Sequence, residues 1–236
     1  SNGAPASTAA AALDLRPGSF ARVFPARWWH DWPVLGVVGS MLRHKYSNTG
    51  VRALLEEPFG VATIGQALTG VAVAAYDIGR GEPRVFTNLG EDRERLMSDV
   101  ALATAAAPGF YPPVELTSRD GASTYVDSAV FTNNAAMIAY TELLRRGAEL
   151  RDVAIVSISA GRARCRLDPE HAARWGFFHW GPNIVRMAVD GASRMADHSL
   201  ADILGATGES PRYPRFEADI PASLEPLDNT ASSNLA

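Results

Sequence analysis

The sequence predicts one α/β domain, organised as a three-layer α/β/α sandwich around a mostly parallel sheet. Short apolar and β-branched runs at 70–78, 84–88, 124–126 and 152–159 have the length and composition of strands. Segments with helical spacing of their apolar residues lie between these runs, and such alternation is typical of layered α/β domains. The 236 residues contain no internal repeat and no low-complexity linker. We therefore expect a single domain over 1–236.

Helices are predicted in the first part of the chain from propensity and spacing. The alanine tract at 9–15 consists of strong helix formers. Aromatic residues recur at three- and four-residue intervals over 20–32, although Pro25 interrupts that segment. An Asn-Thr pair can cap a further helix over 51–57, which a glycine ends.

The second half of the chain shows clearer element boundaries. A Ser-Asp pair can begin a helix over 98–107, and an Asn-Asn pair can begin another over 135–146. A long helix is predicted over 183–204. The run at 152–159 is rich in β-branched residues without alternation, so we expect a strand that is buried on both faces.

Composition excludes several classes of function. The net charge of −4 and the sequence pI near 5.7 give no broad basic surface, so no nucleic-acid partner is expected. The single Cys165 and the five histidines form no metal-binding pattern, and the glycines form neither a P-loop nor a Rossmann fingerprint. We therefore expect no metal and no cofactor.

No segment of the sequence has the pattern of a membrane span or a signal peptide. The apolar runs are far shorter than the roughly 20 residues of a spanning helix. The first residues lack a basic segment followed by an apolar one. We expect a soluble protein, either cytoplasmic or secreted.

Two segments carry a family resemblance. Residues 101–114 read ALATAAAPGFYPPV, and residues 125–137 read YVDSAVFTNNAAM. They resemble the patatin-like phospholipase family, in which a helix ending in A-T-x-A-A-P and an aromatic-Pro-Pro turn precede a strand, Asp-Gly-Gly/Ala and Asn-Asn-Pro. Further blocks agree in order with the family: 45–47, 75–77, 157–161 and 213–215. The resemblance covers most of the chain from about Leu13 onward.

The resemblance implies a lipid acyl hydrolase of the phospholipase A or esterase type, which works through a Ser–Asp dyad and an acyl-enzyme. It implies that Asp127 is the base, because a serine hydroxyl needs an adjacent base to become a nucleophile. Without the resemblance, an Asp at the end of a strand is typical of a turn. Ser128 replaces the first glycine of the family, and it is strained if that turn requires a positive φ.

The nucleophile of the dyad is less clearly marked, because no G-x-S-x-G occurs in the chain. Ser7, at the entrance of the alanine tract, is the best candidate. It is also a plausible N-cap of that helix, and an ungapped alignment instead places Pro5 at the nucleophile position. The alternative function is therefore a degenerate member that binds lipid or a protein partner without turnover.

The start of the chain leads to a further expectation. The first strand and the Gly-rich oxyanion loop of the family would precede residue 1, so we expect both to be lacking, as in a truncated or degenerate bacterial member. A third possibility beside Ser7 and a degenerate site is that the gene extends upstream, in which case the nucleophile motif belongs to residues that precede this chain.

Tryptophans cluster in the segment 20–32. Trp28, Trp29 and Trp32 make up three of the five tryptophans of the chain. An aromatic stripe at helical spacing is most often packed on the body of a domain. The alternative is peripheral contact with a membrane, which suits a lipid or small acyl-ester substrate.

Overall fold

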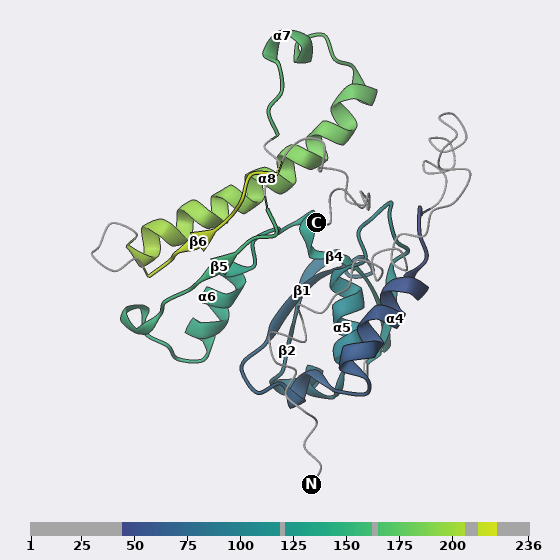
Figure 1. Ribbon diagram of the computed structural model, residues 1–236, viewed down its shortest axis with the longest axis vertical. Helices are drawn as coiled ribbons and strands as arrows, with labels where there is room; N and C mark the ends of the chain where they lie inside the picture. Colours follow the sequence, from purple (N-terminus) through teal and green to yellow (C-terminus); the bar gives the residue numbers. More distant parts are fainter. Residues whose placement is uncertain (1–43, 119–120, 162–164, 206–211, 221–236) are drawn as a thin grey trace. The chain divides into compact units, whose positions relative to one another are not determined.

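The computed structural model describes residues 44–118, 121–161, 165–205 and 212–220 (Figure 1). The described residues form two compact units, which meet in the sequence at Asp127 and Ser128. Both units combine helices with strands, which confirms the α/β class. The helices predicted at 9–15 and 20–32 lie outside the described residues, and so do Ser7 and the three clustered tryptophans.

The first unit contains a four-stranded sheet in the order β2-β1-β4-β3. Its strands are β1 (Ala72–Asp77), β2 (Glu82–Thr87), β3 (Val114–Ser118) and β4 (Gly121–Asp127). All three neighbouring pairs are antiparallel. The predicted mostly parallel sheet is therefore not confirmed by the strands that the structure describes.

A short connection explains the antiparallel pairing of β1 with β2. Strands β1 and β2 are joined by a tight turn in which Asp77 Oδ1 accepts hydrogen bonds from the amides of Gly79 and Arg80, at 2.9 and 3.0 Å. Gly81 completes this turn with a φ of +71°, a conformation that favours glycine. Parallel neighbours need a long crossover, which a turn of this length does not provide. Strand β3, which the sequence analysis did not predict, forms a second hairpin with β4.

Helices α4 (Asn48–Phe59) and α5 (Met97–Thr104) and the 3-10 helices η2 (Ile64–Gln66) and η3 (Gly90–Glu94) complete the first unit. Helix α5 packs on β1, β3 and β4, and α4 packs on α5. Helix α5 begins after Leu96 rather than at the predicted Ser98, which is itself buried. The buried apolar core of this unit includes Ile64, Ala75, Phe86, Val100, Leu102, Ala103, Tyr111 and Tyr125.

The second unit is mainly helical. It contains η4 (Ser128–Val130), α6 (Ala136–Arg145), η5 (Leu150–Asp152), β5 (Ser157–Ile158), α7 (Pro169–Ala172), α8 (Phe177–Leu204) and β6 (Arg215–Phe216). Strands β5 and β6 are parallel. The core of this unit consists of Ala136, Val153, Ile155, Leu200, Leu204 and Tyr213.

Two predictions for the second unit are wrong in detail. In the predicted strand 152–159, Val153 and Ile155 are buried, whereas Val156 and Ile158 are 62% and 80% exposed, so only one face of this segment is covered. Helix α8 begins at Phe177, six residues before the predicted start, because it continues through a Gly-Pro pair that usually ends a helix.

None of the helices in the described ranges is both long enough and apolar enough to span a bilayer.

Candidate active site

Asp127, the predicted base, is the last residue of the interior strand β4. Its backbone lies opposite Ala75 of β1, and its amide donates a hydrogen bond to the carbonyl of Ala106 at 3.0 Å. The residue is half-buried, and it follows the buried pair Tyr125 and Val126. The structure thus places a carboxylate at the end of a central strand, with its backbone fixed on two sides.

The turn that follows α5 holds this end of the sheet. The hydroxyl of Thr104 donates to the carbonyl of Ala74 in β1, at 2.6 Å. Two residues later, Ala106 is 1% exposed and accepts the hydrogen bond from Asp127. The end of α5 is therefore bonded to both interior strands, and small alanine side chains allow this close approach.

The aromatic turn of the 101–114 segment contacts the block at 45–47. The amides of Lys45 and Tyr46 donate to the carbonyls of Gly109 and Phe110, at 3.0 and 2.7 Å. Gly109 has a φ of +85°, and the rings of Tyr46 and Tyr111 lie 5.9 Å apart. Two of the blocks that resemble the family therefore pack on each other, although about sixty residues separate them.

A third block pairs with the strand that carries Asp127. Ala75, Tyr76 and Asp77 lie opposite Asp127, Val126 and Tyr125 in the antiparallel register of β1 and β4. In the sequence, these blocks are related only by their order along the chain. In the structure, the block at 75–77 pairs with the end of β4, and the 101–114 segment is bonded both to this end and to the block at 45–47.

Ser128, which departs from the family pattern, carries no backbone strain. No residue other than glycine has a positive φ anywhere in the described ranges, and Ser128 begins the 3-10 helix η4. Its carbonyl accepts hydrogen bonds from the amides of Phe131 and Thr132, at 3.0 and 2.8 Å. Because this turn uses ordinary backbone angles, serine fits it without the strain that a positive φ would cause.

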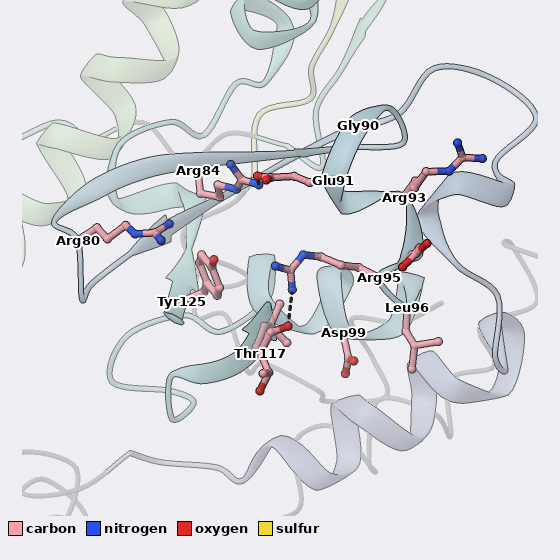
Figure 2. A pocket seen from close by; sticks show the side chains of 12 residues that line it. Arg80, Arg84, Gly90, Glu91, Arg93, Arg95, Leu96, Asp99, Thr117 and Tyr125 are labelled. Atoms are coloured by element: carbon pink, nitrogen blue, oxygen red, sulfur yellow. Dashed lines mark hydrogen bonds and ion pairs between the residues drawn. The ribbon is translucent and has the colours of Figure 1, made fainter. Parts of the chain in front are cut away.

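A cavity of about 680 Å³ lies elsewhere in the first unit (Figure 2). Four arginines line it: Arg80, Arg84, Arg93 and Arg95. Figure 2 shows the guanidinium of Arg84 turned toward Glu91, and Arg95 extending toward Thr117. This cavity could not be predicted from the sequence, because its lining residues come from short elements that carry no recognisable motif.

Asp92 pairs with two of these arginines. This carboxylate is 3% exposed and accepts hydrogen bonds from Arg84 Nη2 at 2.8 Å and Arg95 Nε at 3.1 Å. Burial lowers the pKa of Arg84, but its hydrogen bonds to Glu91 and Asp92 outweigh this effect and raise the pKa above its usual value. Both guanidinium groups also lie 5.5 Å from the ring centre of the buried Phe86. We interpret the network as a structural link between β2 and η3.

Comparison with known proteins extends this picture. The family model of the patatin-like phospholipases matches residues 3–140, which is more than half of the chain. The chain belongs to this family.

Curated plant members of the patatin-like family are similar to most of this chain. Patatin of Solanum tuberosum is 26% identical over 93% of the chain and 64% of its own length. Patatin-like protein 2 of Oryza sativa subsp. indica is 23% identical over 90% of the chain and 60% of its own length. Patatin-like protein 4 of Arabidopsis thaliana is 22% identical over 83% of the chain and 55% of its own length. The chain thus spans less than two thirds of each relative, and the expected bacterial origin stays a prediction.

The patatin-like blocks of the second unit also pair with each other. Ser157 lies opposite Arg215 in the parallel strands β5 and β6, and Arg215 Nη1 donates to Ser157 Oγ at 2.7 Å. Burial lowers the pKa of Arg215, but the hydrogen bond to Glu217 and nearby negative charges raise it overall. Gly161, at the end of the first block, has a φ of +122°, which favours glycine.

The other predicted site residues are not placed by the structure. Ser7 lies outside the described residues, so its role as nucleophile stays a prediction. The same holds for membrane contact through Trp28, Trp29 and Trp32. Within the described ranges, no three His, Cys, Asp or Glu side chains come together in a way that could hold a metal ion.

Proposed function

We propose that this chain hydrolyses acyl esters of lipids, with Asp127 as the general base and Ser7 as the nucleophile. The observation that supports this most strongly is the position of Asp127 at the end of the interior strand β4 in a member of the patatin-like phospholipase family. The packing of the family-like blocks around this end of the strand supports the same role.

The reaction proceeds in two halves. Asp127 takes the proton of the serine hydroxyl while the oxygen attacks the ester carbonyl carbon, which forms a tetrahedral oxyanion. The oxyanion collapses, the bond to the alcohol breaks, and Asp127 returns its proton to the departing oxygen. Water then attacks the acyl-serine, gives a proton to Asp127, and the carboxylic acid is released as the serine regains its hydrogen.

Partial burial suits Asp127 to this role. A carboxylate that acts as a general base must lie within reach of the serine hydroxyl, and a partly exposed position at the end of a strand allows this. Asp127 is half-buried at the edge of the first unit's core. The hydrogen bond from its amide to Ala106 fixes the backbone from which the carboxylate extends.

One observation favours a second candidate function, which is lipid or protein binding without turnover. The chain contains no G-x-S-x-G, the motif that carries the nucleophile at a strand-to-helix elbow in hydrolases of this kind. If Ser7 only caps a helix, a residual carboxylate such as Asp127 would be a relic of an ancestral site.

Labelling with a fluorophosphonate distinguishes the two functions. We expect the full chain to be labelled at Ser7, as read by peptide mass mapping, and the Ser7→Ala variant to lose the label. Ser47→Ala is the matched control, because Ser47 is exposed and its side chain makes no capping hydrogen bond to α4. A chain that is never labelled, or a Ser7→Ala variant that is labelled as strongly as the wild type, would exclude the proposed nucleophile.

A further inference from the structure

Helix α8 exposes a large apolar surface. We define the apolar face of α8 as Phe177, Phe178, Ile184, Val185 and Met195, which are 83%, 85%, 56%, 63% and 68% exposed, respectively. Single exposed apolar residues are common, but a contiguous group of this size usually marks an interaction site. Figure 1 shows that this part of α8 continues toward α7, beyond the part of the helix that contacts α6.

These residues share one side of the helix. Phe177 and Ile184 are seven residues apart, and so are Phe178 and Val185, a spacing that returns to the same side after two turns. Met195 follows Ile184 by eleven residues, or about three turns. The five side chains therefore form a stripe along α8 rather than a scatter of unrelated positions.

The core of the second unit does not account for this stripe. Leu200 and Leu204, the α8 residues in that core, are 0% exposed. Leu200 follows Met195 by five residues, which turns it about 140° around the helix axis. The apolar face is thus directed away from the side by which α8 packs in its own unit.

The charges beside the first four residues of the stripe have one sign, whereas Asp190, which precedes Met195, pairs with Arg194. Residues 173–189 contain two arginines, Arg174 and Arg186, and no acidic residue. Both arginines are exposed. Trp175 and Trp180 flank the start of α8, with their rings 5.4 Å apart in an edge-to-face arrangement. Aromatic residues beside arginines, without acidic residues, are typical of segments that lie in the headgroup region of a bilayer.

We propose that the apolar face of α8 docks on a lipid surface that contains anionic headgroups. Phe177, Phe178, Ile184 and Val185 enter the upper acyl region, and Arg174 complements the headgroup charge. The inference rests on the proposed function in one respect, since the same surface would supply the acyl-ester substrate. It differs from the sequence-based expectation of membrane contact, which concerned Trp28, Trp29 and Trp32.

Vesicle flotation tests the docking. The full chain carrying Asp127→Asn, which prevents turnover, is mixed with vesicles of phosphatidylcholine alone or with phosphatidylglycerol. We expect binding to the mixed vesicles that weakens as salt is raised, and a preference for phosphatidylglycerol that falls in Arg174→Gln. A triple variant carries Phe177→Ser, Phe178→Ser and Ile184→Ser in addition to Asp127→Asn. Its partition coefficient for the mixed vesicles should be lower than that of the parent by at least about tenfold.

The control variant removes exposed apolar residues from the first unit. Val61 and Leu68 are 87% and 85% exposed, so Val61→Ser with Leu68→Ser removes exposed apolar side chains that do not belong to α8. Its partition coefficient should stay within about twofold of the parent, because only contacts at the docked surface contribute to binding. Unchanged helix content by circular dichroism shows that the triple variant is folded.

Three results would overturn the docking proposal. The first is that the parent chain does not bind mixed vesicles. The second is that the triple variant binds them as strongly as the parent. The third is that the chain self-associates through the apolar face and does not bind vesicles. Hydrolysis of a soluble nitrophenyl ester, measured with Asp127 intact, separates this proposal from the proposed function. Face-dependent vesicle binding without ester hydrolysis would support docking and contradict the hydrolase, whereas ester hydrolysis without vesicle binding would do the reverse.

Discussion

The backbone amide of Asp127 donates a hydrogen bond to the carbonyl of Ala106 at 3.0 Å, which joins the end of β4 to the turn after α5. Thr104, the last residue of α5, makes a second link through its side-chain hydroxyl, which donates to the carbonyl of Ala74 in β1. The backbone of the candidate base is therefore held by its pairing with Ala75 and by the hydrogen bond to Ala106. A substitution that changes only this side chain should leave the local backbone in place.

The carboxylate of Asp92 should matter greatly for the stability of the first unit. Asp92→Ala leaves Arg84 and Arg95 without their shared partner, and these side chains are only 29% and 16% exposed. Breaking a buried ion pair costs about 3–5 kcal/mol, and the partial exposure of the arginines reduces this to about 2–3 kcal/mol. Urea unfolding measures the loss.

Glu91→Ala is the control for that variant. Glu91 also pairs with Arg84, at 2.8 Å, but its side chain is 72% exposed. Exposed ion pairs contribute less than about 1 kcal/mol, so this variant should unfold almost like the wild type. Equal losses of stability in the two variants would show that burial of Asp92 is not the decisive difference.

Asn134 should stabilise the second unit through its amide group. The side chain is 3% exposed, its Oδ1 accepts a hydrogen bond from the amide of Ala136 at 3.0 Å, and its Nδ2 donates to the hydroxyl of Tyr213 at 3.4 Å. Asn134→Ala leaves buried groups unpaired, which costs about 1–3 kcal/mol. Tyr213→Phe removes only the long contact and should cost less. Thermal unfolding of both variants checks this order, and a larger loss in Tyr213→Phe would contradict it.

Two glycines should respond in opposite ways to alanine. A Cβ at Gly65 would lie 2.6 Å from the carbonyl oxygen of Arg93, so the backbone must shift, and Gly65→Ala should destabilise the protein by about 1–3 kcal/mol. Gly191, inside α8, has open space around it, and Gly191→Ala should stabilise the helix by about 0.5–1 kcal/mol. Calorimetry that finds a higher Tm for Gly65→Ala than for Gly191→Ala would contradict this prediction.

Local patterns predicted most of the described helices and several strands. Helix α6 begins and ends within one residue of its prediction, because Asn134 and Gly147 mark its two ends. The sheet direction was not predictable in this way. It depends on which strands become neighbours, and β3, which was not predicted, forms an antiparallel hairpin with β4. The exposed face of the 152–159 segment was missed because apolar residues such as Ile158 also occupy that face.

The candidate site was predicted through family blocks rather than through physical pattern. Asp127 alone resembles a turn residue, and only the order of the blocks indicated catalysis. The contacts between blocks, for example the hydrogen bond from the amide of Tyr46 to the carbonyl of Phe110, could not be read from the sequence, because they depend on long-range packing. The network around Asp92 could not be predicted either, because it also depends on contacts between separate elements.

The most direct test of the proposed hydrolase compares Asp127→Asn with Asp99→Asn in the hydrolysis of a soluble nitrophenyl ester. Asp99 lies in the same unit with a side chain 27% exposed and pairs with Arg52, so it is a matched carboxylate outside the proposed reaction. Loss of a general base should lower kcat/KM about 10²- to 10⁴-fold in Asp127→Asn, while Asp99→Asn keeps wild-type turnover. Wild-type turnover by a folded Asp127→Asn chain would contradict the role of Asp127.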